Sequence, residues 1–254
     1  MSGAPTPTIV WLSHHEDDLP AGIDWLVAPE AARAAAMRYT KRHTEYLLAR
    51  WTAKAALAAH LGLSATAAGL ARLEVRNARD GAPEVLLDGA TLPIALSLTD
   101  RAGHAVCALA PAGLAIGCDL ELVEERSAAF VADYLTEAEQ RLVASGGDDA
   151  DRHRLANLVW SAKESALKVL RTGLRRSTLS VEVELLPTPP GAGWAPLLVR
   201  AAEGRRFPGW WRRYGDFLLT VAAESEIPPP AALEDPPRLA IAAPSHTWMR
   251  SPLR

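Results

Sequence analysis

The sequence predicts an α+β protein in which two similar α/β lobes, related by a pseudo-twofold axis, enclose a ligand cleft. A Trp-x-Ala-Lys motif occurs twice, at residues 51–54 and 160–163, each time in a segment that favours helix. An apolar, strand-like run follows each copy at a similar offset, at 105–110 and at 218–223. Two matched elements in the same order indicate a duplicated unit, and the space between two lobes is a usual ligand site. The resulting division is an N-terminal lobe (1–112), a C-terminal lobe (113–226) and a tail (227–254).

In the first lobe, residues 29–61 predict one long helix. Strong helix formers continue after Pro29 without another proline or glycine, and Gly62 provides a natural C-terminal stop. Beyond it, the pattern predicts a turn, strand and turn over 81–89, and strands over 96–98 and 105–110 around a polar turn at 99–103.

In the second lobe, the apolar run 113–121 predicts a strand that ends in acidic residues. The pattern then predicts helices over 128–134, 137–144 and 152–170, and strands over 179–185, 197–200 and 217–223. After Ile227 the chain becomes proline-rich, which predicts a segment that either wraps the surface or lacks order.

The composition excludes several classes of protein. With 49% apolar residues and 22% charged residues the chain can bury a core, and its net charge of −3 argues against a general nucleic-acid binder. The two cysteines, Cys107 and Cys118, provide no disulfide framework, which favours a reducing cytoplasm. No signal peptide is indicated, and the longest apolar stretch is interrupted by Pro111, so we expect no membrane partner.

An acidic motif follows the third apolar run, in the sequence Gly117-Cys118-Asp119-Leu120-Glu121. Strand alternation places Asp119 and Glu121 on one face, where the two carboxylates repel each other unless a cation or water separates them. Oxygen ligands without histidine or cysteine favour Mg²⁺, which commonly takes one or two carboxylates together with phosphate oxygens and water. A D-x-E motif alone is weak evidence, since it also suits a solvated strand end.

The two copies of the repeated helix differ in charge. Where the first has Ala55 and Ala59, the second has Glu164 and Lys168. Positions i and i+4 share a helix face, so this carboxylate and ammonium point the same way. An exposed ion pair would be worth only a few tenths of a kcal/mol, but combined with the D-x-E strand the pattern is much more specific for a phosphate and metal site.

At this point the sequence resembles a family. GCDLE, then LTEAE, then WSAKESALK resemble the signature of 4′-phosphopantetheinyl transferases of the larger, surfactin-synthase-activating type, and the resemblance covers about residues 38–224. It implies a monomeric, Mg²⁺-dependent enzyme of two similar lobes. Such an enzyme transfers the 4′-phosphopantetheine moiety of coenzyme A to a serine of an apo acyl, polyketide or peptidyl carrier protein and releases adenosine 3′,5′-bisphosphate.

The resemblance also implies catalytic roles. Asp119, Glu121 and Glu164 match the Mg²⁺ ligands, and Lys168 matches the lysine that reaches the phosphate of the leaving group. Glu164 is also the candidate that takes the proton of the carrier serine. Lys163 matches the family lysine before the acidic ligand, and its different direction on the helix suits a substrate or lobe-interface contact.

Contacts with coenzyme A follow from the same comparison. Lys41 and Arg42 lie where the family has basic residues for the nucleotide phosphates, although a solvated basic helix start is an equally good interpretation of either one. Pro83 belongs to a G-A-P turn that resembles the family's adenine–ribose turn. Thr99, Asp100 and Arg101 occupy a family turn whose histidine contacts the 3′-phosphate of coenzyme A. Here Asp100 replaces that histidine and would repel the phosphate, and Arg101 could supply a substitute charge.

Two further interpretations come from other classes of function. Loss of that histidine suits a non-catalytic homologue that still binds carrier proteins, but the intact set of acidic and basic residues argues against it. The carboxylates alone would also suit a Mg²⁺-dependent nucleotide phosphohydrolase. Phe130, Tyr134 and Leu135 match the segment where carriers dock, and the sequence does not identify which carrier is served.

Overall fold

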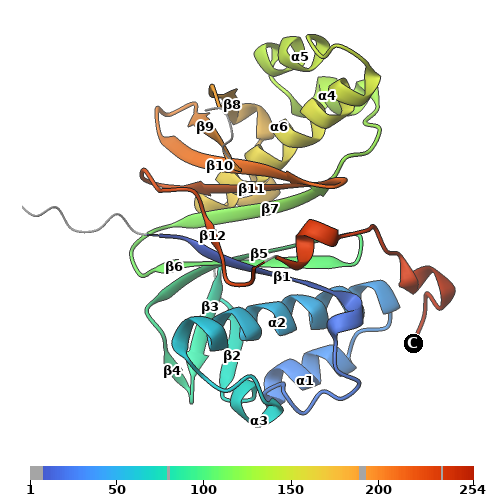
Figure 1. The fold of residues 1–254 in the computed structure, drawn as a ribbon, viewed down its shortest axis with the longest axis vertical. Helices are drawn as coiled ribbons and strands as arrows, with labels where there is room; N and C mark the ends of the chain where they lie inside the picture. Colours follow the sequence, from blue (N-terminus) through green and yellow to red (C-terminus); the bar gives the residue numbers. More distant parts are fainter. Residues whose placement is uncertain (1–7, 79–80, 189–192, 236) are drawn as a thin grey trace, which may run out of the picture.

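The computed structural model describes residues 8–78, 81–188, 193–235 and 237–254. It is a mixed α/β structure, as the expected α+β class requires. Two β-sheets lie face to face at the centre, with helix α2 (Thr40–Leu61) on one outer side and helix α6 (Asp149–Val169) on the other (Figure 1). No helix in these described ranges is both long and apolar enough to cross a membrane.

Among its described residues, the first half of the chain contains one strand, three α-helices and five further strands. In order they are β1 (Val10–His15), α1 (Ala28–Ala35), α2, α3 (Ala67–Leu70), β2 (Leu73–Asn77), β3 (Pro83–Leu87), β4 (Ala90–Thr91), β5 (Ile94–Arg101) and β6 (His104–Pro111), with a 3-10 turn at Glu16–Asp18.

The single helix predicted over 29–61 is two helices, α1 and α2, separated at residues 36–39. None of these four residues is a glycine or proline, so no local signal marks the break. The break lets α1 fold back on the body of the protein, where Glu30 accepts a hydrogen bond from Val75 N at 2.9 Å. The polar turn predicted at 99–103 is also shorter, because β5 and β6 are joined by Ala102 and Gly103, both with positive φ, as in a two-residue hairpin.

The second half begins with β7 (Ile116–Leu122) and places three helices before its remaining strands. These elements are α4 (Ala128–Tyr134), α5 (Glu137–Ala144), α6, β8 (Val181–Leu185), β9 (Ala195–Ala201), β10 (Arg206–Tyr214) and β11 (Phe217–Ala223). The sequence analysis missed β10, whose proline, glycine and arginines disfavour a strand. Its neighbours override that preference, because β10 pairs with β9 on one side and β11 on the other.

The sheets have the strand orders β12-β1-β6-β5, in which β12 is Ala231–Ala232 of the tail, β2-β3-β4 and β7-β11-β10-β9-β8. Strand β7, at the edge of the five-stranded sheet, lies against β5 of the first half. Ser97 Oγ accepts a hydrogen bond from Cys118 N at 2.9 Å, and Thr99 Oγ1 accepts one from Leu120 N at 3.1 Å. Consequently the acidic motif on β7 lies at the contact between the two halves.

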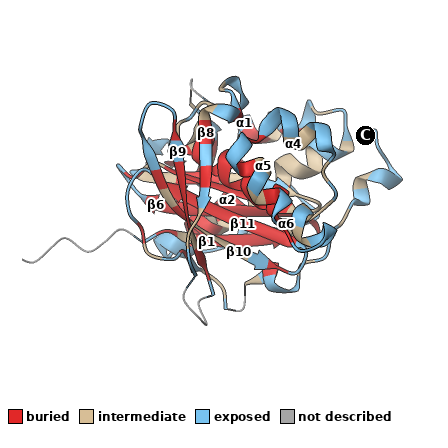
Figure 2. Cartoon of the chain, turned by 90° about the horizontal axis from the view of Figure 1, so that it is seen from above, coloured by how far each residue is buried: buried red, intermediate tan, exposed pale blue. Residues whose placement is uncertain are grey.

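Three apolar clusters stack through the molecule. One lies between α2 and its sheet and includes Leu57 and Leu109, and another lies between α6 and the five-stranded sheet. The third lies between the two sheets and includes Trp11, Leu120 and Phe217. The central strands are therefore buried on both faces, while the helices expose their outer faces (Figure 2). Strand β7 is buried along almost its whole length, and close packing of this kind holds the strand in place.

The same buried ion pair occurs in both halves. Lys54 Nζ on α2 lies 2.6 Å from a carboxylate oxygen of Glu30 on α1, and Lys163 Nζ on α6 lies 2.6 Å from Glu139 on α5. Each glutamate also accepts a hydrogen bond from a strand amide, in β2 and β8 respectively. The two lysines that the repeated sequence motif shares thus tie a helix to the preceding helix and to a strand in each half.

The proline-rich tail runs along the surface of the first half. Its strand β12 (Ala231–Ala232) pairs in parallel with β1, and Leu239 is fully buried in the cluster between the sheets. Farther on, Pro252 O accepts a hydrogen bond from Thr40 N at 3.1 Å at the start of α2. The tail therefore has defined partners along its length.

Candidate active site

Asp119, on β7, is the centre of the candidate site. Its carboxylate is buried, and Oδ1 accepts hydrogen bonds from Lys168 Nζ at 2.9 Å and from Thr99 Oγ1 at 3.2 Å. The other oxygen, Oδ2, is buried without a hydrogen-bond partner among the described residues. A buried carboxylate oxygen without a partner is costly, and a bound cation or donor group would satisfy this atom.

Glu164, on α6, provides a second oxygen of the same kind. Its Oε1 is buried, and no part of the chain that the structure describes donates a hydrogen bond to it. Burial, followed by the negative charge of Asp119, raises the pKa of Glu164 above its ordinary value. Two neighbouring unpartnered carboxylate oxygens are suited to a hard cation such as Mg²⁺.

Lys168 lies one helical turn beyond Glu164. Its ammonium donates to Asp119 Oδ1 and, at 2.8 Å, to Cys118 O. Burial alone would lower the pKa of Lys168, but the negative charge of Asp119 and other neighbours outweighs it, and the pKa is raised. Lys168 therefore stays charged beside the two carboxylates, as the helix spacing predicts.

Glu121 differs from the expectation. Its Oε1 accepts a hydrogen bond from Trp160 Nε1 at 2.9 Å, and its Oε2 lies 3.0 Å from Arg126 Nη2 and 3.3 Å from Arg101 Nε. Burial and the charge of Asp119 raise the pKa of Glu121 to about 7, against the opposing effect of the two arginines. Because both oxygens have protein donors, Glu121 differs from Asp119 and Glu164, each of which has one carboxylate oxygen without a partner among the described residues. Within the described ranges, no three metal-binding side chains are arranged around one point.

The turn that the sequence assigned to coenzyme A has other partners. Thr99 is buried and binds Asp119 and the amide of Leu120, which corrects its assignment from a coenzyme A contact to support of β7. Arg101 pairs with Glu121 and with Glu124, so it does not provide the substitute phosphate charge that the sequence suggested. The sequence could not indicate these partners, because they lie about 20 residues away on β7 and beyond.

Lys163 is also corrected. Its side chain is fully buried, and besides Glu139 its ammonium donates to Thr178 O and Val181 O, each at 2.9 Å. A lysine surrounded by protein acceptors in the core does not reach a substrate. It stabilises the junction of α5, α6 and β8 instead.

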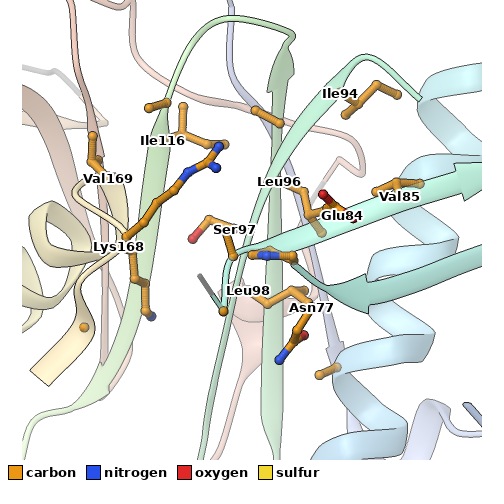
Figure 3. A pocket seen from close by; sticks show the side chains of 18 of the residues that line it. Asn77, Glu84, Val85, Ile94, Leu96, Ser97, Leu98, Ile116, Lys168 and Val169 are labelled. Atoms are coloured by element: carbon orange, nitrogen blue, oxygen red, sulfur yellow. The ribbon is translucent and has the colours of Figure 1, made fainter. Parts of the chain in front are cut away.

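A cavity of about 600 Å³ opens between the two halves beside Lys168. Lys168 and Val169 form one wall, Ser97, Leu96 and Leu98 lie in the middle, and Glu84 and Val85 form the opposite wall (Figure 3). The predicted contact Pro83 also lines it. Its volume is within the range of ligand pockets that bind drug-sized molecules.

The remaining predicted contacts lie elsewhere. Lys41, Asp100 and Arg101 line a smaller cavity of about 140 Å³, together with His246 and Trp248 of the tail. Asp100 keeps an exposed surface, yet loss of solvation, followed by the charge of Glu45, raises its pKa to about 6. Arg42 is exposed on the first turn of α2. The structure thus places Pro83 and Lys168 at one cavity and Lys41, Asp100 and Arg101 at another, whereas Arg42, Thr99 and Lys163 line neither of the two.

Sequence reasoning missed two arginines of the large cavity. The guanidinium carbons of Arg33 and Arg50 lie 5.5 Å and 4.8 Å from the ring centre of Tyr46. Arg50 is only 7% exposed, and its Nε lacks a hydrogen-bond acceptor in the described structure but lies 3.9 Å from Glu30 Oε1. Arg50 therefore already has one counter-charge, and the two guanidinium groups together would still attract an anion in the cavity. The i, i+4 spacing of Tyr46 and Arg50 on α2 was a usable signal, whereas the position of Arg33 depends on the break before α2.

An aromatic cluster lies on the other side of Glu121. The rings of Phe130, Tyr134 and Trp160 are 5.0–5.3 Å apart, and Tyr134 is 40% exposed. Helix α4, which carries Phe130 and Tyr134, has no buried residue along its described length. An aromatic surface of this kind suits contact with another protein.

The comparisons with known proteins agree with these features. A family model described as the 4′-phosphopantetheinyl transferase superfamily matches residues 115–220, which run from just before β7 into β11. A comparison with curated proteins found no match to the chain. The matched region contains the acidic motif, α6 and the aromatic cluster, and the resemblance to this superfamily that the sequence motifs predict is therefore confirmed for residues 115–220.

Proposed function

We propose that this chain transfers the 4′-phosphopantetheine moiety of coenzyme A to a serine of an apo carrier protein, in a reaction that depends on Mg²⁺. The products are the holo-carrier and adenosine 3′,5′-bisphosphate. The superfamily match supports phosphopantetheine transfer as the general reaction. The observation that carries the proposal is the pair of buried carboxylate oxygens on Asp119 and Glu164, unpartnered among the described residues, next to a lysine that lines the 600 Å³ cavity.

Asp119 and Glu164 are the side chains that would hold Mg²⁺, with phosphate oxygens and water completing the site. The bound ion would neutralise the charge that develops on the phosphate oxygens as the anhydride breaks. Glu121 would join the ligands only after Arg101 and Arg126 release it, so its main role here is to hold Trp160 and the two arginines beside Asp119.

Coenzyme A would lie in the 600 Å³ cavity. The Pro83 turn would contact the adenosine, and Arg33 and Arg50 would attract its phosphates. Lys168 would supply a positive charge at the pyrophosphate, close to the two carboxylates. A fixed charge of this kind contributes most where negative charge increases in the transition state.

The chemical step needs no protein nucleophile. The carrier serine Oγ forms a bond to the phosphorus that carries pantetheine, and the bond from this phosphorus to the bridging oxygen breaks. Adenosine 3′,5′-bisphosphate leaves with the electron pair, and the serine proton passes to a base. Glu164 suits this role because its carboxylate lies near Lys168, the lysine proposed to bind the phosphate.

Two broader features belong to the same proposal. We take the two halves to be duplicated lobes related by a pseudo-twofold axis, as the repeated lysine–glutamate pairs suggest. We also take the Phe130–Tyr134–Trp160 cluster as the carrier-docking surface, because Trp160 connects it to Glu121 beside the site.

The deciding experiment combines the protein, coenzyme A, Mg²⁺ and a panel of apo-carriers. The proposal predicts a mass increase on the carrier serine with one adenosine 3′,5′-bisphosphate released per carrier modified. Carrier binding without modification would instead indicate the non-catalytic homologue that the Asp100 replacement suggests. Nucleotide release without a carrier would indicate a phosphohydrolase.

A further inference from the structure

Helix α6 lies close to the backbone of the sheet at Gly117, on β7. A Cβ added to Gly117 would lie 1.9 Å from the backbone oxygen of Ser165 and 2.9 Å from Cβ of Lys168. Restoring even a 3.0 Å contact would require α6 to move away by about 1 Å. The absence of a side chain at this position therefore determines how closely α6 lies to β7.

A network of buried hydroxyl groups also fixes the distance between α6 and β7. Thr220, on β11, lies opposite Asp119 in the β7–β11 pairing. Its Oγ1 is 2.9 Å from Ser161 Oγ and 2.7 Å from Ser165 Oγ, and all three hydroxyl residues are fully buried. Ser161 Oγ also donates to Asp119 O at 3.2 Å. The network therefore connects α6 directly to the backbone that carries Asp119.

The functional groups depend on this spacing. Glu164 lies next to Ser165 on α6, and Lys168 reaches Cys118 O and Asp119 Oδ1 at 2.8 Å and 2.9 Å. The two sides of the site come from different elements, because Asp119 is on β7 while Glu164 and Lys168 are on α6. A change in the helix-to-strand distance would separate them without changing any of the three residues.

We infer that Gly117 is a positioning residue, whose missing side chain sets the α6–β7 spacing at which Glu164 and Lys168 act together with Asp119. This inference rests on the proposed function, because the rate expected to fall is that of phosphopantetheine transfer. The motif residues alone do not align the reacting groups. Their alignment also requires the close backbone contact between α6 and β7.

Gly117→Ala tests the inference, with Gly209→Ala as a matched control. Gly209, on β10 of the same sheet, would also gain a forbidden Cβ contact, 2.3 Å from Val221 O, but its three nearest atoms belong to β9 and β11. Both variants should therefore lower the thermal stability. Only Gly117→Ala should lower kcat, by about 100-fold, because a displacement of about 1 Å is enough to misalign reacting groups. The control should keep kcat within about twofold of wild type if it affects packing alone.

Calorimetric titration with Mg²⁺ provides a measurement that does not need transfer activity. Gly117→Ala should weaken Mg²⁺ binding about tenfold, as loss of support for ligands commonly does, and Gly209→Ala should not. A wild type that binds Mg²⁺ but modifies no carrier would refute the proposed function alone, and the titration would still decide the role of Gly117. If Gly117→Ala lost stability like the control but kept wild-type kcat and Mg²⁺ affinity, the inference would be overturned.

Thr220→Val covers the case in which Gly117→Ala does not fold. Valine keeps the volume of threonine but removes the hydroxyl shared by Ser161 and Ser165. The inference predicts a fall in kcat of about fivefold, which is the effect of one net hydrogen bond on the position of α6. Unchanged kcat and Mg²⁺ affinity in a destabilised Thr220→Val protein would contradict it.

Discussion

Lys168→Met separates the phosphate role of this lysine from its part in stability. Methionine keeps a long, unbranched side chain but removes the ammonium that contacts Asp119 at 2.9 Å and Cys118 O at 2.8 Å. A hydrogen bond to a charged group contributes about 1.5–3 kcal/mol, which corresponds to roughly a 10- to 150-fold loss if the bond to phosphate acts in the transition state. We therefore expect kcat to fall by about this factor, measured as the rate of mass increase on an apo-carrier at saturating coenzyme A.

Lys54→Met is the control for this prediction. Lys54 is fully buried against Glu30, so its loss should leave an uncompensated carboxylate and cost about 3–5 kcal/mol of stability. Lys168 is 27% exposed, and solvent should make its loss less destabilising. The control should have the lower melting temperature but, below that temperature, a near-normal kcat. If the two variants lost kcat equally, or if Lys168→Met remained fully active, Lys168 would have no special role at the phosphate.

Three further predictions concern the cavities and pH. Arg33→Ala should raise KM for coenzyme A about tenfold with little change in kcat, whereas Arg72→Ala, in an exposed pair with Asp88, should change neither constant. If Asp100 weakens the contact with the 3′-phosphate, Asp100→His should lower KM for coenzyme A about tenfold but leave KM for dephospho-coenzyme A unchanged, and equal effects on both would contradict this. Because the pKa of Asp100 is raised to about 6, the folded state binds the Asp100 proton more tightly than the unfolded state does. Ionisation of Asp100 therefore lowers the free energy of unfolding as pH rises through about 4 to 6. Asp100→Asn should therefore gain melting temperature relative to wild type between pH 4 and pH 7, and a constant difference across that range would refute the assignment.

The sequence was most informative where a local period carries the geometry. Strand alternation placed Asp119 on β7, and the i, i+4 spacing placed Glu164 and Lys168 together on α6. All three meet in the structure because α6 packs on the strand that carries the acidic motif. The repeated Trp-x-Ala-Lys motif also had structural meaning, since both of its lysines form the same buried pair with a glutamate.

The remaining features depend on contacts between distant segments. Nothing local marks the break between α1 and α2, and for that reason the place of Arg33 beside Tyr46 could not be predicted. The resemblance gave Lys163 a substrate-like role, but its partners at Thr178, Val181 and Glu139 become visible only when α5 and β8 are in place. Arg101 and Glu121 were assigned to separate tasks, although their pairing requires β5 to lie against β7.

The most direct test of the account is the rate at which Glu164→Gln modifies an apo-carrier in the presence of coenzyme A and Mg²⁺. The substitution keeps the shape of the side chain while removing the charge that the proposal assigns to Mg²⁺ and to the serine proton. The account predicts a rate at least about 100-fold below that of wild type, with a melting temperature that is not lowered and weakened Mg²⁺ binding by calorimetry. A Glu164→Gln protein that modifies the carrier at close to the wild-type rate would contradict the central claim.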